Sequence, residues 1–252
     1  MATSFVICSD FRCGSHFIAS ALETRGDVFG DVEVLGDKAK PFIHESTVAA
    51  RYAQLWKPAR LRTYEAVGFI MHREDYVLDG DPVELLPDDC RVIFLHRHRQ
   101  FRRYVSKMVA RQRKKWQDYG EGGAIDCEVS IKVDLAHMIS NIREYERRYD
   151  RYDRALVRFP RIHLTYEHML ADPAGTLDAI QEFLGLDPEP IMPSTRKQVA
   201  RPLAEVVTDY EILVGLLCDT RFAMYCDGDD GSAEHAVPAV ERFKAWFNLA
   251  EG

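Results

Sequence analysis

A short polar stretch follows the first apolar run of the chain, and its residue types suit the binding of an anion. The run ends at Ser9, and Arg12, Gly14 and Ser15 come directly before an amphipathic segment. A glycine lets the backbone approach a ligand closely, and the N–H groups at the start of a helix point at one spot. Arginine adds a fork of donors that is charged at neutral pH. The stretch therefore predicts an anion site between a strand and a helix.

Two well-known phosphate sites do not fit this stretch. The P-loop pattern GxxxxGK[ST] is absent, and the loop contains no lysine. A cysteine phosphatase needs the spacing Cys-x5-Arg, whereas Cys8 and Arg12 have Cys-x3-Arg. A strand–turn–helix with an incidental arginine remains an alternative to the anion site.

A second concentration of positive charge follows a later apolar run. Nine of the 33 basic residues lie between positions 97 and 115. Most of residues 111–115 are interpreted as a solvated helix face. Arg97 differs, because it follows a predicted strand and open α/β sheets bind ligands at the carboxyl ends of their strands. In a chain with a formal net charge of −7, this segment predicts a local patch that attracts an anionic ligand.

The bulk composition limits the classes of partner. The 252 residues are 46% hydrophobic and 29% charged, as in an ordinary globular protein. The negative net charge disfavours nucleic acid and anionic membranes, and no apolar stretch approaches the ~20 residues of a membrane span. No signal peptide is expected. Six scattered cysteines without a CxxC pair favour reduced thiols in the cytoplasm over disulfides or a zinc site.

Short apolar runs alternate with helical patterns along the chain, which predicts an α/β fold with a mainly parallel sheet flanked by helices. We expect a single domain over residues 1–252, with a core at about 5–225 and a C-terminal helix at about 238–249. The predicted strands are Phe5–Cys8, Ala66–Ile70, Val92–Leu95 and Ile162–Thr165. The predicted helices are Ser15–Thr24, His44–Trp56, Gln100–Trp116, Leu135–Tyr149, Ala174–Leu184 and Leu203–Leu217. Asp172 and Pro173 predict a helix start, and Gly185 a helix end. Two long loops, 118–131 and 186–202, are candidates for function.

Three segments resemble the PAPS-dependent sulfotransferases, where PAPS is 3′-phosphoadenosine 5′-phosphosulfate. The stretch FRCGSHF resembles their 5′-phosphosulfate loop, and LHRHRQFRRYVS resembles their 3′-phosphate element. LTYEHMLADPAGTLDAIQEFLGL is similar to the segment that follows in these enzymes. The likeness is greatest to bacterial carbohydrate sulfotransferases of the nodulation-factor and trehalose type, on YVSKMVARQRKKW and RKQVARPL. It is collinear over about residues 5–225 and implies the P-loop nucleotide-kinase-like sulfotransferase fold.

The resemblance implies transfer of a sulfuryl group from PAPS to a hydroxyl or amine, leaving 3′-phosphoadenosine 5′-phosphate (PAP). It places the 5′-phosphosulfate on the first loop, at Arg12, Cys13, Gly14, Ser15, His16 and Phe17. It places the 3′-phosphate on Arg97 and Ser106. A late basic segment with Arg196, Lys197 and Arg201 would close over the nucleotide. No metal is expected, since arginines and backbone dipoles can stabilise the leaving phosphate.

For the base that takes the acceptor proton, the resemblance favours Glu33 in GDVFGDVEVLG. Its apolar flanks would help raise the pKa of the carboxyl group. Asp31 is the alternative if the register differs by two residues, and His44 and His72 are further candidates. His16 opens the first helix, where it could donate to the sulfuryl group.

The sequence departs from the family at two positions. Ile70 stands where this branch often has lysine, which leaves contacts of that strand with the sulfuryl group or the acceptor open. Phe11 stands where proline commonly precedes the arginine, which changes the stiffness of the loop. Residues 36–60, 70–86 and 118–131 are expected to line the acceptor pocket, with the aromatic side chains Tyr52, Trp56, Tyr64 and Tyr76.

The expected acceptor is a small molecule or a glycan, and a homodimer is consistent with the relatives. Two other functions remain open. A kinase or NTPase would use the same kind of anion site, although it usually needs a P-loop lysine and carboxylates for magnesium. An inactive relative would bind PAP without transferring anything.

Overall fold

The protein, represented by a computed structural model, is described over residues 2–31, 45–72, 82–114, 116, 129–194 and 201–225. The described residues contain one five-stranded sheet in which every pair of neighbouring strands is parallel. Its order is β2-β3-β1-β4-β5, and the strands are β1 (Thr3–Ser9), β2 (Val28–Asp31), β3 (Ala66–His72), β4 (Arg91–His96) and β5 (Arg161–Thr165). The predicted α/β class with a mainly parallel sheet is confirmed. The edge strand β2 was not expected.

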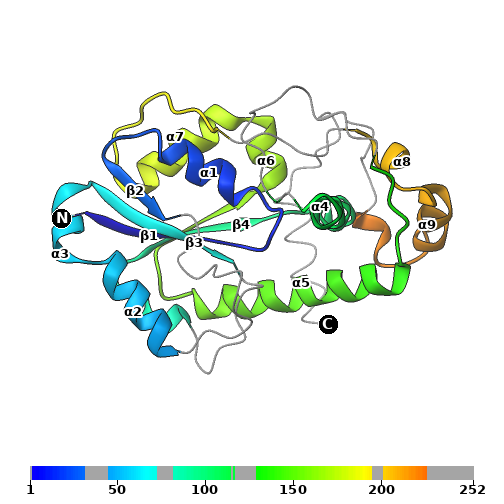
Figure 1. Ribbon diagram of the computed structural model, residues 1–252, viewed down its shortest axis with the longest axis horizontal. Coiled ribbons are helices and arrows are strands. Elements are labelled where there is room, and N and C mark those ends of the chain that lie inside the picture. Colours follow the sequence, from blue (N-terminus) through cyan, green and yellow to red (C-terminus); the bar gives the residue numbers. More distant parts are fainter. Residues whose placement is uncertain are drawn as a thin grey trace.

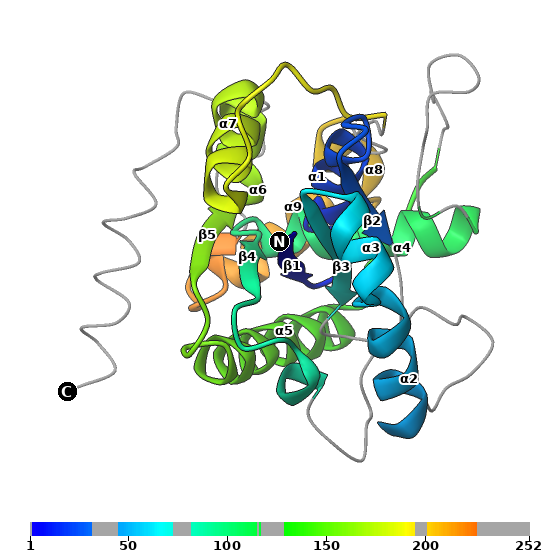
Figure 2. The ribbon, with the colours of Figure 1, turned by 90° about the vertical axis from the view of Figure 1, so that its left-hand side faces the viewer.

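Helices cover both faces of the sheet, as the buried central strands require. Figure 2 shows α1 and α7 on one face and α2 and α5 on the other. The α-helices are α1 (Ser15–Leu22), α2 (Glu45–Leu55), α3 (Pro58–Thr63), α4 (Gln100–Arg113), α5 (Leu135–Ala155), α6 (Tyr166–Ala171), α7 (Pro173–Leu184), α8 (Leu203–Val206) and α9 (Tyr210–Leu217). Two short 3₁₀ helices are η1 (Pro82–Leu85) and η2 (Ala223–Tyr225).

Each face of the sheet has its own core, because successive strand residues point to opposite sides. On one face, Ile7 of β1 belongs to a buried cluster with Leu177 of α7. On the other face, its neighbour Val6 belongs to a cluster with Tyr149 of α5. The central strand β1 pairs with both β3 and β4, so its last residues lie between the ends of these two strands.

The carboxyl ends of the strands meet at one edge, and α4 stands there (Figure 1). The 21-residue helix α5 runs beneath the sheet and continues past this edge under α4 (Figure 1). A third buried cluster joins these two helices, through residues such as Val105 of α4 and Ile142 of α5. The edge is therefore supported from below by a single long helix.

Two of the predicted helices show where the sequence pattern agrees with the structure and where it does not. The helix expected over 174–184 forms as predicted, with Asp172 Oδ1 accepting the Gly175 N–H at 2.9 Å and Gly185 left-handed at φ 74°. The prediction of a single helix over 203–217 is wrong, because α8 ends at Val206 and α9 begins at Tyr210. Val207 is extended and forms an isolated parallel bridge with Ile131, a conformation that its β-branched side chain favours.

The expected C-terminal helix at 238–249 lies outside the described residues. Among the helices that are described, none is long and apolar enough to cross a membrane.

Candidate functional site

The loop between β1 and α1 has a backbone that only a few residue types tolerate. Arg12 and Gly14 both have positive φ, at 68° and 96°. A Cβ on Gly14 would lie 2.5 Å from Cε of Met169 and 2.9 Å from Cδ2 of Tyr166. Glycine is therefore required here both by conformation and by space. Gly14 is also the N-cap of α1, and its carbonyl oxygen accepts the Phe17 N–H at 3.0 Å, so the helix begins directly at the loop.

Arg12 reaches from this loop to α4. Its Nε donates to the hydroxyl of Ser106 at 2.9 Å, and its Nη1 donates to the carbonyl oxygen of Trp116. Burial and, to a smaller extent, the positive charge of Arg97 together lower the pKa of the Arg12 guanidinium to about 10. Keeping this desolvated cation beside Arg97 therefore costs free energy, and a bound anion would reduce that cost.

Arg97 comes immediately after β4 and lies beside the same loop. Its Nη1 donates to the carbonyl oxygen of Arg12 at 2.8 Å, and its guanidinium stacks over the ring of Tyr166 at 4.1 Å from the centroid. Its side chain is only 4% exposed, and its Nε has no hydrogen-bond partner among the described residues. The two predicted anion-binding elements therefore meet at one edge of the sheet, with a buried donor left over.

The other residues predicted on the loop are placed in different ways. The Cys13 side chain is fully buried in the core cluster under α1, and its Sγ lies 4.0 Å from the Tyr145 hydroxyl. Ser15 is buried at the start of α1. Phe17 packs against the core beneath α1. His16 is half-buried, with its ring 5.9 Å from that of His72.

The late basic segment and the predicted base are described only in part. The carbonyl oxygen of Arg201 accepts from Arg102 Nη2 of α4 at 2.8 Å, so this residue lies beside the helix that carries Ser106. Arg196 and Lys197 lie outside the described residues, as do Glu33 and His44. Asp31 ends β2, but its side chain is not described.

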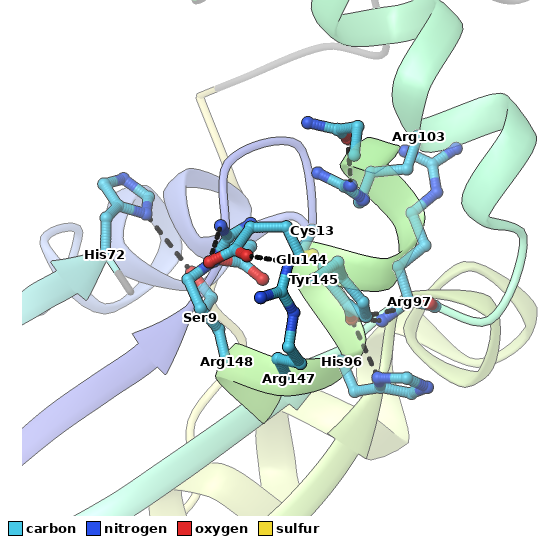
Figure 3. Close-up of polar contacts among 12 residues, drawn as sticks. Ser9, Cys13, His72, His96, Arg97, Arg103, Glu144, Tyr145, Arg147 and Arg148 are labelled. Carbon is cyan, nitrogen blue, oxygen red and sulfur yellow. Dashed lines mark hydrogen bonds and ion pairs between the residues drawn. The ribbon is translucent and has the colours of Figure 1, made fainter. Parts of the chain in front are cut away.

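His72, another candidate base, ends β3 one strand away from the loop. It is 2% exposed, its ring centroid lies 4.4 Å from that of Phe11, and its Nδ1 lies 3.5 Å from the hydroxyl of Ser9. Figure 3 shows His72 facing Ser9 at the end of β1. The imidazole therefore lies at the entry of the loop. Ile70, in contrast, is buried in the core cluster under α1. Its side chain therefore does not make the ligand contact that a lysine would make at this position.

Three residues around the site were not expected to take part. The carboxylate of Glu167 accepts the backbone N–H groups of His98 and Arg99 at 3.1 and 3.0 Å, and so fixes the turn that carries Arg97. Asp10 is fully buried, and its Oδ1 lies 3.1 Å from Nε of Arg148 on α5. Glu167 belongs to the segment LTYEHMLADPAGTLDAIQEFLGL, which already resembled the family in the sequence, whereas nothing local marks Asp10 and Arg148 as partners.

The aromatic residues expected around the acceptor belong largely to the core. Tyr52 is buried against Phe69, with ring centroids 5.0 Å apart, and the prediction that it lines a pocket is wrong. Trp56 packs on the same ring at 6.3 Å. Tyr64 lies against Phe29 near the starts of β2 and β3, away from the loop. Tyr76 lies outside the described residues.

A comparison of the sequence with models of known protein families identifies the family of this chain. Residues 34–190, more than half of the chain, match the model of the sulfotransferase family. The match includes Arg97 and Ser106 and begins after the β1–α1 loop. No curated protein matches the chain.

Two solved structures are similar at low identity. The sulfotransferase domain of the Synechococcus PCC 7002 olefin synthase has 15% identity and a TM-score of 0.41, covering 75% of this chain and 76% of that domain. A sulfotransferase from Alicyclobacillus acidocaldarius has 14% identity and a TM-score of 0.41, covering 89% of this chain and 99% of that one.

Proposed function

The chain belongs to the sulfotransferase family, and we propose that it transfers a sulfuryl group from PAPS to a hydroxyl or amine of a small-molecule or carbohydrate acceptor. The observation that carries this proposal is the joining of two cationic elements. Arg97 Nη1 donates to the Arg12 carbonyl at 2.8 Å, and Arg12 Nε donates to Ser106 at 2.9 Å. A nucleotide with phosphates at both its 5′ and 3′ positions needs two such elements side by side.

The described residues fit an anion with several charged oxygens. The buried Nε of Arg97 has no hydrogen-bond partner among them, and a phosphate oxygen would supply one. The lowered pKa of Arg12 reflects a cation held in a desolvated place next to another cation. A negatively charged group beside each arginine would stabilise both charges, and both arginines present planar forks that match phosphate oxygens.

We assign the two ends of the donor to different elements. The 5′-phosphosulfate lies at the first turn of α1 and the loop before it, with Arg12, Cys13, Gly14, Ser15, His16 and Phe17. The 3′-phosphate lies against Arg97 and Ser106. Arg196, Lys197 and Arg201 form the late segment that closes over the nucleotide and excludes water, which suppresses hydrolysis of the donor.

Sulfuryl transfer then requires two kinds of help from the chain. A bond forms from the acceptor oxygen or nitrogen to sulfur, and the bond from sulfur to the bridging phosphate oxygen breaks. Arg12 and the N–H groups of α1 stabilise the charge that accumulates on the leaving phosphate. A base takes the acceptor proton, and His16 donates to the sulfuryl group.

We propose Glu33 as that base, with His72 as the rival because it lies beside Phe11 at the loop entry. Loss of a general base lowers the rate by about 10²–10⁴-fold. Glu33→Gln should therefore reduce transfer from labelled PAPS by at least about 100-fold. Unchanged transfer in this variant, together with its loss in His72→Asn, would assign the proton transfer to His72 instead.

Likeness to the nodulation-factor and trehalose type puts carbohydrates first among the acceptors to be screened with labelled PAPS. We propose the cytoplasm as the compartment, because no disulfide forms among the described cysteines Cys8, Cys13, Cys90 and Cys218. Measurement of the mass of the protein in solution tests whether it is a homodimer.

Calorimetric titration with PAP and with ATP tests the donor. We expect micromolar binding of PAP that Arg97→Ala abolishes and that Arg111→Ala, which changes an exposed arginine of α4, leaves intact. Preference for ATP with a dependence on magnesium would reject the proposal in favour of a kinase or NTPase. Binding of PAP without transfer to any acceptor would identify an inactive relative.

A further inference from the structure

Tyr145 of α5 lies between the two anion-binding elements and contacts both. Its hydroxyl accepts the backbone N–H of Arg97 at 3.0 Å and lies 2.8 Å from Nδ1 of His96. The same oxygen is 4.0 Å from Sγ of Cys13 on the β1–α1 loop. The side chain is 1% exposed. Figure 3 shows Tyr145 pointing up from α5 into the space between Cys13 and Arg97.

We propose that Tyr145 is a positioning residue, which holds Arg97 in the orientation that binds the 3′-phosphate and fixes it relative to the loop that binds the 5′-phosphosulfate. This inference rests on the proposed function of the site. Tyr145 itself need not touch the nucleotide, since it acts through the backbone of Arg97.

The neighbours of Tyr145 on α5 make the same kind of contact. Asn141, one turn earlier, accepts from Arg103 Nη2 at 2.7 Å, and Arg148, one turn later, pairs with Asp10 at 3.1 Å. Residues 141, 145 and 148 share one helix face. That face therefore contacts α4, the turn after β4 and the loop after β1, which are the three segments that must be held together.

The hydrogen bond to Tyr145 replaces one that the sheet no longer supplies. Pairing between β4 and β5 ends at His96 and Thr165, so the N–H of Arg97 lies just beyond the ladder. A buried N–H without a partner is costly, and the turn would rotate to expose it or find another acceptor. Because an arginine side chain is long, a small rotation at its Cα displaces the guanidinium much further. The hydroxyl thus controls where the charge of Arg97 lies.

The ring of Tyr145 has a separate structural role. The guanidinium of Arg103 stacks over it at 4.5 Å from the centroid, and Arg103 Nε also donates to Oε1 of Gln100 at 2.6 Å. Phenylalanine at position 145 keeps this ring and its volume. Tyr145→Phe therefore removes the hydroxyl alone, which makes it the variant to test.

The decisive measurement compares the affinities for PAP and for AMP, which lacks the 3′-phosphate. We expect Tyr145→Phe to weaken PAP binding about five- to tenfold, as loss of one buried hydrogen bond predicts. AMP binding should change by less than about twofold, because the 5′-phosphate site does not use Arg97. General loosening of the fold would weaken both ligands to the same extent, and an equal loss would overturn the proposal.

A double-mutant cycle with Arg97→Ala tests whether the effect passes through Arg97. In the Arg97→Ala background, Tyr145→Phe should have no further effect on PAP affinity. A further loss equal to that in the wild-type background would overturn the proposal. The matched control is Tyr152→Phe, which removes the hydroxyl of a buried tyrosine two turns further along α5 and should keep the wild-type ratio of PAP to AMP affinities.

Failure of the inference and failure of the proposed function give different results. If the wild-type protein prefers PAP to AMP and Arg97→Ala removes this preference, the function stands. If Tyr145→Phe then keeps the wild-type preference for PAP over AMP, only the role of Tyr145 is overturned. If the wild-type protein binds PAP no better than AMP, the assignment of Arg97 to a 3′-phosphate is wrong, and the inference is overturned with it. Thermal unfolding of each variant verifies that it is folded.

Discussion

Arg12 and Ser106 are 94 residues apart in the chain, yet the guanidinium Nε of one donates to the hydroxyl of the other at 2.9 Å. The contact joins the loop after β1 to the helix after β4. A serine hydroxyl that accepts from an arginine keeps its own proton for a second acceptor. Ser106 can therefore orient Arg12 and donate to a phosphate oxygen at the same time.

Ser106→Ala tests this double role. Loss of the hydroxyl removes one donor to the phosphate and releases the Nε of Arg12, so we expect PAP affinity to fall by about fivefold or more in calorimetric titration. Ser4→Ala is the matched control, because Ser4 is equally buried, at 6% exposure, but lies at the opposite end of β1. Equal affinities of the two variants for PAP would exclude Ser106 from the site.

The features of the site that the sequence could predict are those determined by local residue types. A run of buried strand residues ending in a turn with Arg12 and Gly14 is recognisable by itself, and so is Arg97 after another strand. Parallel strands bring their carboxyl ends to one edge, so a meeting of these two segments follows from the fold class. The structure adds that Arg12 and Ser106 are in direct contact.

Other features depend on contacts that no local pattern encodes. Tyr145 and Arg148 occupy an amphipathic helix in which a buried tyrosine is indistinguishable from an ordinary core residue, and their partners Cys13 and Asp10 are 132 and 138 residues away. Aromatic type also fails to distinguish pocket from core, as the burial of Tyr52 demonstrates. The edge strand β2 has only four residues, including Gly30 and Asp31, so its apolar run is too short to recognise.

Gly14→Ala should damage both stability and binding. The new Cβ meets Tyr166 and Met169 in a left-handed conformation, so we expect the free energy of unfolding to fall by about 2 kcal/mol. Because Tyr166 lies under the guanidinium of Arg97, its displacement should also weaken PAP binding.

Gly26→Ala is the control for this substitution, since nothing lies within 4 Å of a Cβ at Gly26. We expect its unfolding free energy to stay within about 0.5 kcal/mol of the wild type in urea denaturation. If Gly14→Ala is equally neutral, the loop is not constrained as its geometry indicates.

The lowered pKa of Arg12 predicts a loss of PAP binding at high pH. Its guanidinium is charged below about pH 10 and loses its proton as the pH rises through that value. Anion affinity should therefore be constant from about pH 7 to 9 and fall above about pH 10, with a somewhat higher midpoint in the complex because the bound phosphate favours the cation. Titrations across this range, with circular dichroism to verify folding, measure the effect.

Arg12→Gln separates this titration from that of the lysines, which lose their protons in the same range. The variant should bind PAP more weakly at every pH, and its affinity should fall less steeply above pH 10. Identical slopes for the two proteins would mean that Arg12 does not supply the titrating charge.

Away from the site, a buried arginine connects the start of β2 to the end of α7. Arg25 donates from Nε and Nη2 to the carboxylate of Asp27 at 2.8 and 2.7 Å, and its Nη1 donates to Gln181 Oε1 at 2.6 Å. Hydrogen bonding to Arg25 lowers the pKa of the Asp27 carboxyl group. Arg25 and Asp27 directly precede β2, and the proposed base Glu33 follows β2 in the sequence.

Asp27→Asn should remove a pH-dependent part of the stability. Because the pKa of Asp27 is lower in the folded than in the unfolded chain, its stabilisation is complete above the unfolded value of about 3.9 and is lost as the pH falls through the folded value. The carboxylate is 34% exposed, so we expect a deficit of only about 1 kcal/mol at pH 7 in urea denaturation. That deficit should shrink as the pH falls below about 3.9 and through the lower folded value. Asp178→Asn, which changes an exposed carboxylate of α7, should match the wild type throughout. A deficit that stays constant with pH would show that shape, rather than the charge of Asp27, holds Arg25 in place.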